Sequence, residues 1–189
     1  MALIALIYDS GARVQEIADL TVGDIRLTPA TVKLTGKGNI TRIIPITGQT
    51  TKILDTYLKE YGLLGEEAIN LPLFSNRGNC KLTRAGITYI LSKYVEVAKK
   101  KEPKLFPKKV SPHLLRHSKA MHLLQANVNL IYIRDFLGHA SVTTTERCAK
   151  ADSEIKRKAI EKANPNFLPD KKYNKKEKNE LLNWLKVII

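Results

Sequence analysis

The sequence predicts a mostly α-helical protein with one small antiparallel β-sheet, an α+β fold. Apolar residues recur at helical spacing along much of the chain, for example in TTKILDTYLKEY at residues 50–61. Three stretches of strand composition, GDIRL, TVKLT and RIIPI, lie together near the N-terminus. The last two are joined by GKGN, which is typical of a hairpin turn. We therefore expect a single small sheet surrounded by helices.

The first elements are expected to be two short helices. Residues 2–9 form an apolar stretch, and the segment VQEIADL that follows Gly11 has helical spacing. The four residues SGAR between them favour a turn, because glycine adopts backbone conformations that other residues avoid. The three predicted strands come next, and the helix at 50–61 follows them.

The later helices carry recognisable end signals. Thr83 is placed to cap a helix over residues 83–98. Pro112 suits the first turn of a helix that opens with SPHLLRHSKAMHLLQ. Between them, residues 99–112 contain three prolines and six lysines and are expected to be a loop. Gly138 is expected to end the helix NLIYIRDFL.

Composition changes near the C-terminus and predicts two parts. Residues 143–150 and 153–163 are expected to be helical pieces that complete a domain spanning residues 1–163. Residues 164–189 begin as a polar, basic stretch and end in the apolar segment LLNWLKVII. We expect this part to be a linker followed by a C-terminal helix, whose apolar face contacts either its own domain or a neighbouring protomer.

Charge and cysteine content narrow the function classes. The 189 residues include 32 Lys+Arg and 18 Asp+Glu, a net charge of +14, which favours a polyanionic partner and above all nucleic acid. Basic ribosomal and membrane-surface proteins are the alternatives. Two cysteines make no disulfide framework, and no apolar run is long enough for a membrane span. The protein is therefore expected to be cytoplasmic.

Basic side chains at the ends of the expected elements suggest a site for a phosphodiester. They are Arg13, Lys37, His113, Arg116 and His139, with His113 and Arg116 three residues apart on one helix face. Two guanidiniums can fork onto the non-bridging oxygens of a phosphate as negative charge builds there. A lysine can protonate a leaving oxygen, and histidines can donate hydrogen bonds or relay protons.

Each of these residues also has a simpler interpretation. Arg13 can cap a helix or bridge to Glu16, and Lys37 can be a solvated turn residue. His113 and His117 have the spacing of a zinc-binding pair, but the sequence between them lacks the glutamate of an H-E-x-x-H motif and a third ligand is not apparent. We therefore expect neither a metal nor another cofactor.

Four blocks in order make the sequence similar to a known family. GARVQEIADL, the GKG hairpin tip, SPHLLRHSKAMHLL and FLGHASVTTTERC resemble the catalytic domain of the tyrosine recombinase (phage-integrase-like) family over about residues 1–150. The most specific part is the H-x-x-R-H helix followed by L-G-H. The resemblance implies site-specific cleavage and rejoining of double-stranded DNA without ATP or metal. Type IB topoisomerases share this chemistry, but the hairpin-to-helix spacing and the L-G-H block look more like recombinases.

The resemblance assigns a role to each of these residues. Arg13 and Arg116 look like the two phosphate-clamping arginines, and Lys37 resembles the hairpin lysine that protonates the leaving 5′-oxygen. His113 looks like the histidine of the H-x-x-R pair, and His139 like the histidine of L-G-H. By the same resemblance, Glu16 orders the region around Arg13.

A cysteine occupies the position where the family has its nucleophile. The family's tyrosine lies nine residues after the L-G-H histidine and forms a 3′-phosphotyrosine, and here that position is Cys148. The substitution can inactivate the chain, whether natural or introduced, including as a thiol for cross-linking. Alternatively Cys148 is itself a nucleophile, or a neighbouring subunit donates a tyrosine. A thiol in an electropositive pocket is also reactive towards other reagents.

The resemblance also bears on assembly. The family carries a separate N-terminal DNA-clamping domain, and we expect this sequence to contain the catalytic domain without it. The family also acts as a tetramer whose C-terminal helices are exchanged between protomers. We expect DNA binding with strong salt dependence, with the lysine-rich segment 99–109 either contacting DNA or simply solvated. A non-catalytic DNA-binding or regulatory module of the same fold is the alternative function, and an RNA-binding protein is a third. The DNA site, and integration, excision or transposition as the task, stay open.

Overall fold

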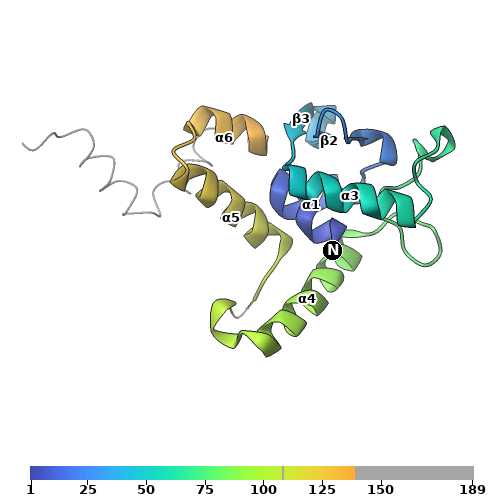
Figure 1. Cartoon of the computed structure of the whole chain (residues 1–189). Helices are drawn as coiled ribbons and strands as arrows, with labels where there is room; N and C mark the ends of the chain where they lie inside the picture. Colours follow the sequence, from blue (N-terminus) through green and yellow to red (C-terminus); the bar gives the residue numbers. More distant parts are fainter. Residues whose placement is uncertain (108, 139–189) are drawn as a thin grey trace, which may run out of the picture. The chain divides into compact units, whose positions relative to one another are not determined.

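The structure is a computed structural model, and it describes residues 1–107 and 109–138. Six α-helices and three strands are found in this part of the chain (Figure 1). The helices are α1 (Ala2–Ser10), α2 (Val14–Ala18), α3 (Gly48–Glu60), α4 (Arg84–Lys101), α5 (Pro112–Gln125) and α6 (Leu130–Leu137). The strands are β1 (Ile25–Arg26), β2 (Thr31–Thr35) and β3 (Thr41–Pro45). The predicted mostly-α composition with one small sheet is confirmed. The helices expected at 143–150 and 153–163, and the boundary at 163, lie outside the described residues.

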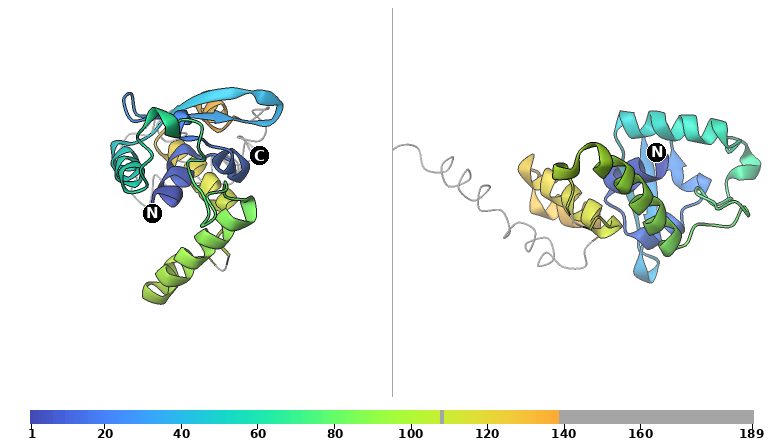
Figure 2. Two further views of the ribbon diagram at one scale, coloured as in Figure 1. Left: turned by 90° about the vertical axis from the view of Figure 1, so that its right-hand side faces the viewer. Right: turned by 90° about the horizontal axis from the view of Figure 1, so that it is seen from below.

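The three strands form one antiparallel sheet in the order β1–β2–β3. In the β2–β3 hairpin Val32 pairs with Ile44 and Lys33 with Ile43. Because side chains alternate between the two faces of a strand, Val32, Leu34 and Ile44 are buried while Ile43 is exposed. The hairpin is visible in both views of Figure 2 as a narrow ribbon that ends in a free tip.

Helix α1 lies at the centre of the hydrophobic core. It packs against both α3 and α5, as Figure 1 shows, and its Leu6 and Ile7 are fully buried. The same core includes Leu54 and Leu58 of α3 and Ile87 of α4. Burying side chains of this size is the main source of stability in such a domain. The core therefore fixes the position of the turn that follows α1, where the candidate site lies.

Most predicted helix ends are confirmed to within two residues, and two departures have a clear physical cause. Asp24 accepts hydrogen bonds from the backbone and side chain of Thr21, which coils residues 22–24 into a 3-10 turn and confines the strand expected in GDIRL to β1. Helix α4 continues to Lys101, three residues beyond the expected end, because lysines are good helix formers and favour the last turn. Pro103 then follows in a 3-10 turn.

Thr83 caps α4 as predicted, since its hydroxyl accepts a hydrogen bond from the Gly86 backbone N–H at 3.1 Å. Thr83→Ala is expected to lower the free energy of unfolding by about 1 kcal/mol, because that N–H loses its partner. Urea denaturation followed by circular dichroism measures the change. Thr56→Ala, an exposed position inside α3, is the matched control, and equal stabilities for the two variants would contradict the capping role.

Candidate functional site

The site begins at the corner between α1 and α2. Gly11 ends α1 with φ of 57°, the left-handed conformation that glycine adopts without strain. Arg13 then caps α2, and the Glu16 carboxylate accepts hydrogen bonds from the Arg13 backbone N–H at 2.7 Å and from its Nη1 at 3.0 Å. The Glu16 side chain thus closes back onto the N-cap backbone as in one half of a capping box, while the Arg13 guanidinium, which has no acceptor, donates to the same carboxylate. Glu16 is thus held inside the corner and is buried.

A second arginine reaches the same carboxylate from the sheet. Arg42 of β3 donates from Nη1 to Glu16 Oε1 and from Nη2 to Glu16 Oε2, both at 2.8 Å. This two-fork geometry is the strongest form of an arginine–carboxylate pair. The Glu16 side chain is 3% exposed and that of Arg42 is 13% exposed, so the pair is nearly withdrawn from water. It joins α2 to the β2–β3 hairpin.

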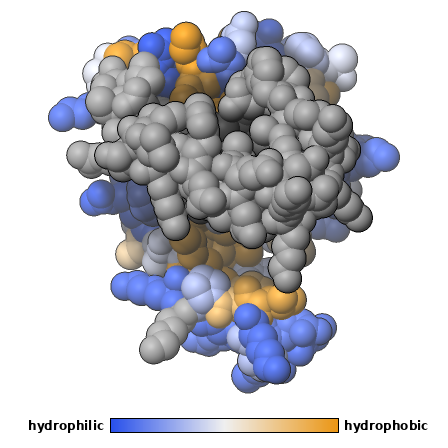
Figure 3. All heavy atoms as spheres, turned by 90° about the vertical axis from the view of Figure 1, so that its left-hand side faces the viewer, coloured by the Kyte–Doolittle hydropathy of each residue, from blue (hydrophilic) through white to orange (hydrophobic). Residues whose placement is uncertain are grey.

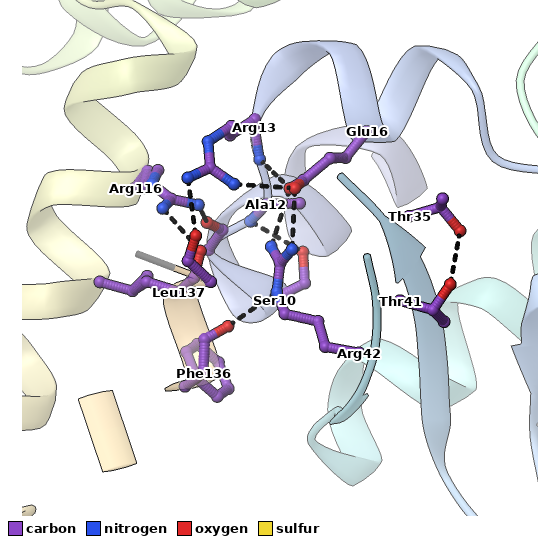
Figure 4. A network of polar contacts seen from close by, with 12 residues as sticks. Ser10, Ala12, Arg13, Glu16, Thr35, Thr41, Arg42, Arg116, Phe136 and Leu137 are labelled. Atoms are coloured by element: carbon purple, nitrogen blue, oxygen red, sulfur yellow. Dashed lines mark hydrogen bonds and ion pairs between the residues drawn. The ribbon is translucent and has the colours of Figure 1, made fainter. Parts of the chain in front are cut away.

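Three arginines converge on the end of α6. Arg42 Nε donates to the carbonyl oxygen of Phe136 at 3.1 Å, Arg116 Nη2 to that of Leu137 at 2.7 Å, and Arg13 Nη2 to that of Gly138 at 2.8 Å (Figure 4). The last carbonyls of a helix have no partner within the helix and carry partial negative charge. The guanidiniums satisfy these carbonyls, and Arg13 and Arg116 are brought side by side because they bind successive carbonyls.

Arg116 and Arg13 differ in exposure. Arg116 is 6% exposed, and its Nη1 also donates to the carbonyl oxygen of Gly11 at 2.7 Å, so it links α5 to both the α1–α2 corner and α6. The Arg13 side chain is 44% exposed. Arg13 is therefore the guanidinium of this pair that solvent or an anion reaches directly, with Arg116 behind it.

The electrostatics of the cluster favour an anion. Burial opposes ionisation of Glu16, but hydrogen bonds from Arg42 and Arg13 outweigh it and hold the Glu16 pKa below its ordinary value. Glu16 therefore stays ionised at neutral pH, and it offsets only one of the three guanidiniums. The cluster keeps an excess of positive charge at its exposed edge.

A second buried ion pair fixes the helix that carries Arg116. Lys119 Nζ donates to Asp9 Oδ1 at 3.1 Å, and Asp9 Oδ2 accepts from the Thr47 backbone N–H at 2.7 Å. Burial raises the pKa of Asp9, and these bonds more than offset it, so its pKa lies below the ordinary value. The contact holds α5 against α1 one turn after Arg116.

The other predicted site residues lie around this cluster. Lys37 is exposed at the tip of the β2–β3 hairpin. A Cβ atom on its neighbour Gly36 would lie 3.2 Å from Glu16 Oε1, so the base of the tip touches the cluster. His113 is exposed in the first turn of α5, one turn before Arg116.

Two predicted site residues follow the last described position in the sequence. His139 and Cys148 lie outside the described residues. His139 follows in sequence directly after Gly138, where the described chain ends. Among the described residues, no group of three His, Cys, Asp or Glu side chains is arranged to hold a metal ion. Within the same residues, each helix is too short or too polar to cross a membrane.

Sequence reasoning missed Arg42. A signal was present, because Arg42 alternates in phase with Ile44 and Ile46, whose side chains are buried. A charged residue at an inward-facing strand position needs a partner, and Glu16 is that partner. The three carbonyl acceptors could not be found this way, since backbone groups leave no mark in the side-chain pattern.

Comparisons of the sequence with known proteins agree with this fold. The model of the phage integrase family matches residues 1–154. Tyrosine recombinase XerC of Roseiflexus sp. (strain RS-1) is 36% identical over 148 residues, which cover 77% of this chain and 45% of the relative. Tyrosine recombinase XerD of Corynebacterium glutamicum is 35% identical over 145 residues, covering 77% and 46%. The chain spans about half the length of the curated relatives it matches.

Solved structures give the same result. XerA recombinase superposes with a TM-score of 0.73 at 25% identity, over 88% of this chain and 58% of that one. XerH site-specific recombinase, in a post-cleavage complex with its palindromic difH substrate, superposes with a TM-score of 0.68 at 28% identity, over 84% and 44%. The predicted tyrosine-recombinase catalytic-domain fold is confirmed, and the chain belongs to the phage integrase family.

Proposed function

We propose that the chain is the strand-cleaving portion of a site-specific recombinase that binds double-stranded DNA at the arginine cluster. The observation that carries this proposal is the convergence of Arg13 and Arg116 on successive carbonyls immediately before His139. Two adjacent guanidiniums on one fixed turn match the two non-bridging oxygens of a phosphodiester. The positive excess at the exposed edge stabilises charge that develops on those oxygens in the transition state.

The proposed reaction exchanges one phosphodiester for another. With tyrosine in place of Cys148, the tyrosine hydroxyl loses its proton to solvent and its oxygen attacks phosphorus, the bond from phosphorus to the 5′-oxygen breaks, and the Lys37 ammonium gives a proton to the leaving oxygen. The products are a 3′-phosphotyrosine and a 5′-hydroxyl. Attack by the 5′-hydroxyl of another strand reverses the step and joins the strands. His113 and His139 donate hydrogen bonds to the phosphate in this scheme.

With Cys148 in the nucleophile's position, we propose that this chain binds DNA but does not cleave it. A cysteine side chain ends roughly 4 Å short of the point that a tyrosine oxygen reaches, and attack needs an approach of about 3–3.5 Å. The same substitution favours a second candidate function, a non-catalytic module that occupies DNA sites.

Segment 99–109 is the proposed supplementary DNA contact. Lys100, Lys101 and Lys104 are exposed where α4 ends and a 3-10 turn follows. Hydrophilic side chains lie around a smaller hydrophobic patch at the bottom of Figure 3. Phosphate contacts of this kind position a protein on DNA and weaken steeply with salt. We further propose that the protein acts on DNA as a homo-oligomer, a tetramer by family resemblance, in the cytoplasm.

Cys148→Tyr tests the proposal. Binding sites are first selected from random duplex DNA, and a selected site is then built as a nicked substrate that traps the covalent intermediate. We expect a covalent protein–DNA band on a denaturing gel for Cys148→Tyr alone, because only that variant has the nucleophile in reach of phosphorus. Cys148→Phe is the matched control, since it has the same ring without the hydroxyl.

Three results would contradict parts of the proposal. A band with the parent chain would make the Cys148 thiol a nucleophile. Binding by every variant without any band would favour the non-catalytic module. Selection of structured RNA over duplex DNA would overturn the proposal altogether.

A further inference from the structure

We propose that Arg42 is a positioning residue for the phosphate-binding arginines, acting through Glu16 and the end of α6. This inference rests on the proposed function, because it concerns the same site. Arg42 itself faces inward and is nearly buried, so it holds the site from behind. Its three hydrogen bonds all end on groups that contact Arg13 or precede His139.

The first effect of Arg42 is electrostatic. Glu16 accepts hydrogen bonds from both Arg13 and Arg42, and both of its oxygens are bound by Arg42. If a neutral residue replaces Arg42, Arg13 is the remaining charged partner of Glu16 among the contacts that the structure describes. The carboxylate then cancels the charge of the exposed guanidinium that faces the phosphate. Arg42 therefore keeps Arg13 available to an anion.

The second effect is steric and concerns the turn before His139. Gly138 has φ of 64°, and a Cβ atom there would lie 2.8 Å from Arg42 Nη1. The guanidinium thus packs directly against the Gly138 backbone while its Nε binds the Phe136 carbonyl. Arg42 fixes the place where α6 stops, and with it the point from which the chain continues to His139.

The position of Arg42 in the sequence links this support to the hairpin. It lies on β3, and Lys37 is at the tip between β2 and β3. A change at Arg42 can therefore act on the phosphate clamp, as proposed here, or on the hairpin lysine. The two routes differ chemically. Lys37 acts by protonating the leaving oxygen, whereas the arginines act by binding the phosphate.

The experiment compares Arg42→Gln with Arg26→Gln, both in the Cys148→Tyr chain. Arg26 is exposed on β1 of the same sheet, so it controls for the loss of one positive charge from the sheet. At saturating DNA, Arg42→Gln is expected to slow covalent attachment about 100-fold, the scale of a misplacement of roughly 1 Å. The DNA affinity of Arg42→Gln is expected to change far less than its rate. Arg26→Gln is expected to attach at nearly the rate of the Cys148→Tyr chain.

Two further measurements separate positioning from general damage. Adding Glu16→Gln to Arg42→Gln is expected to restore about tenfold of the rate, because no carboxylate is left to cancel Arg13. In a second measurement the substrate has a sulfur at the 5′-bridging position, so its thiolate leaving group needs no protonation. Arg42→Gln is expected to attach to this substrate as slowly, relative to the Cys148→Tyr chain, as it does to the ordinary one. If that substrate restored the rate, the effect of Arg42 would act through Lys37 and the proposal would be wrong. A double variant no faster than Arg42→Gln would also overturn it.

Hydrogen exchange tests the proposal even if Cys148→Tyr fails to cleave DNA. Backbone amides at residues 133–138 are expected to exchange faster in Arg42→Gln than in Arg26→Gln, with α3 amides unchanged, because the end of α6 has lost a partner. Equal exchange at the end of α6 in the two variants would refute the positioning role. Failure of covalent attachment in the Cys148→Tyr chain itself, by contrast, would count against the proposed function alone.

Discussion

Arg116→Met in the Cys148→Tyr chain is expected to slow covalent attachment to DNA by about 100- to 1,000-fold. The buried guanidinium binds the carbonyl oxygens of Gly11 and Leu137 and lies beside that of Arg13. Methionine fills the space but donates nothing, so the phosphate loses a preorganised positive charge. Rates from the trapped nicked substrate, measured at saturating DNA, give the size of the loss.

Arg116→Lys provides the conservative comparison for this prediction. Lysine keeps the charge but has a single nitrogen, which cannot reproduce a fork that spans Gly11 and Leu137. A large loss is therefore expected for lysine too, with both variants folded at the assay temperature as judged by circular dichroism. Attachment within a few-fold of the parent for either variant would exclude Arg116 from the phosphate clamp.

Glu16→Ala is expected to lower the free energy of unfolding by about 3 kcal/mol, the scale for breaking a buried ion pair from one side. Arg42, which is 13% exposed, would be left without its carboxylate, and the Arg13 backbone N–H would lose its acceptor. Urea denaturation at pH 7 measures the loss. Glu96→Ala, at an exposed position of α4, is the control, and a similar change in both variants would contradict the account.

The stability lost in Glu16→Ala is also expected to depend on pH. Hydrogen bonds from Arg42 and Arg13 overcome the effect of burial and place the folded-state pKa of Glu16 below its ordinary value. Its contribution to stability is then complete above the unfolded-state pKa and is lost as pH falls through the folded-state value. The stability difference between parent and Glu16→Ala should therefore shrink in acid, and a difference that grows in acid would reverse the assignment.

Local signals explain how much of the fold could be predicted from the sequence. Thr83, Pro112 and Gly138 mark helix ends through interactions within a few residues, and each lies where expected. The start of the GDIRL strand was predicted wrongly because Asp24 folds back onto Thr21, a side-chain contact that competes with strand pairing.

The candidate site could be predicted only in part, for a different physical reason. Arg13 and Arg116 were found because they sit in recognisable sequence blocks, and the structure brings them together. Arg42 was missed because its partner Glu16 is 26 residues away in sequence, and its other partner is a backbone carbonyl. Roles for Lys37 and His113 stay predictions, and His139 and Cys148 lie outside the described residues.

The corner at Gly11 has a consequence for the order of events during synthesis. Its carbonyl is bound by Arg116, 105 residues later, and the adjacent Arg13 binds Gly138, 125 residues later. Contacts between such distant segments form late, because long loops must close first. A growing chain that lacks α6 lacks the three successive carbonyl oxygens on which Arg42, Arg116 and Arg13 converge. If the proposed function holds, the phosphate clamp is therefore incomplete until α6 has left the ribosome, and a partly synthesised chain is expected to bind DNA more weakly than the finished one.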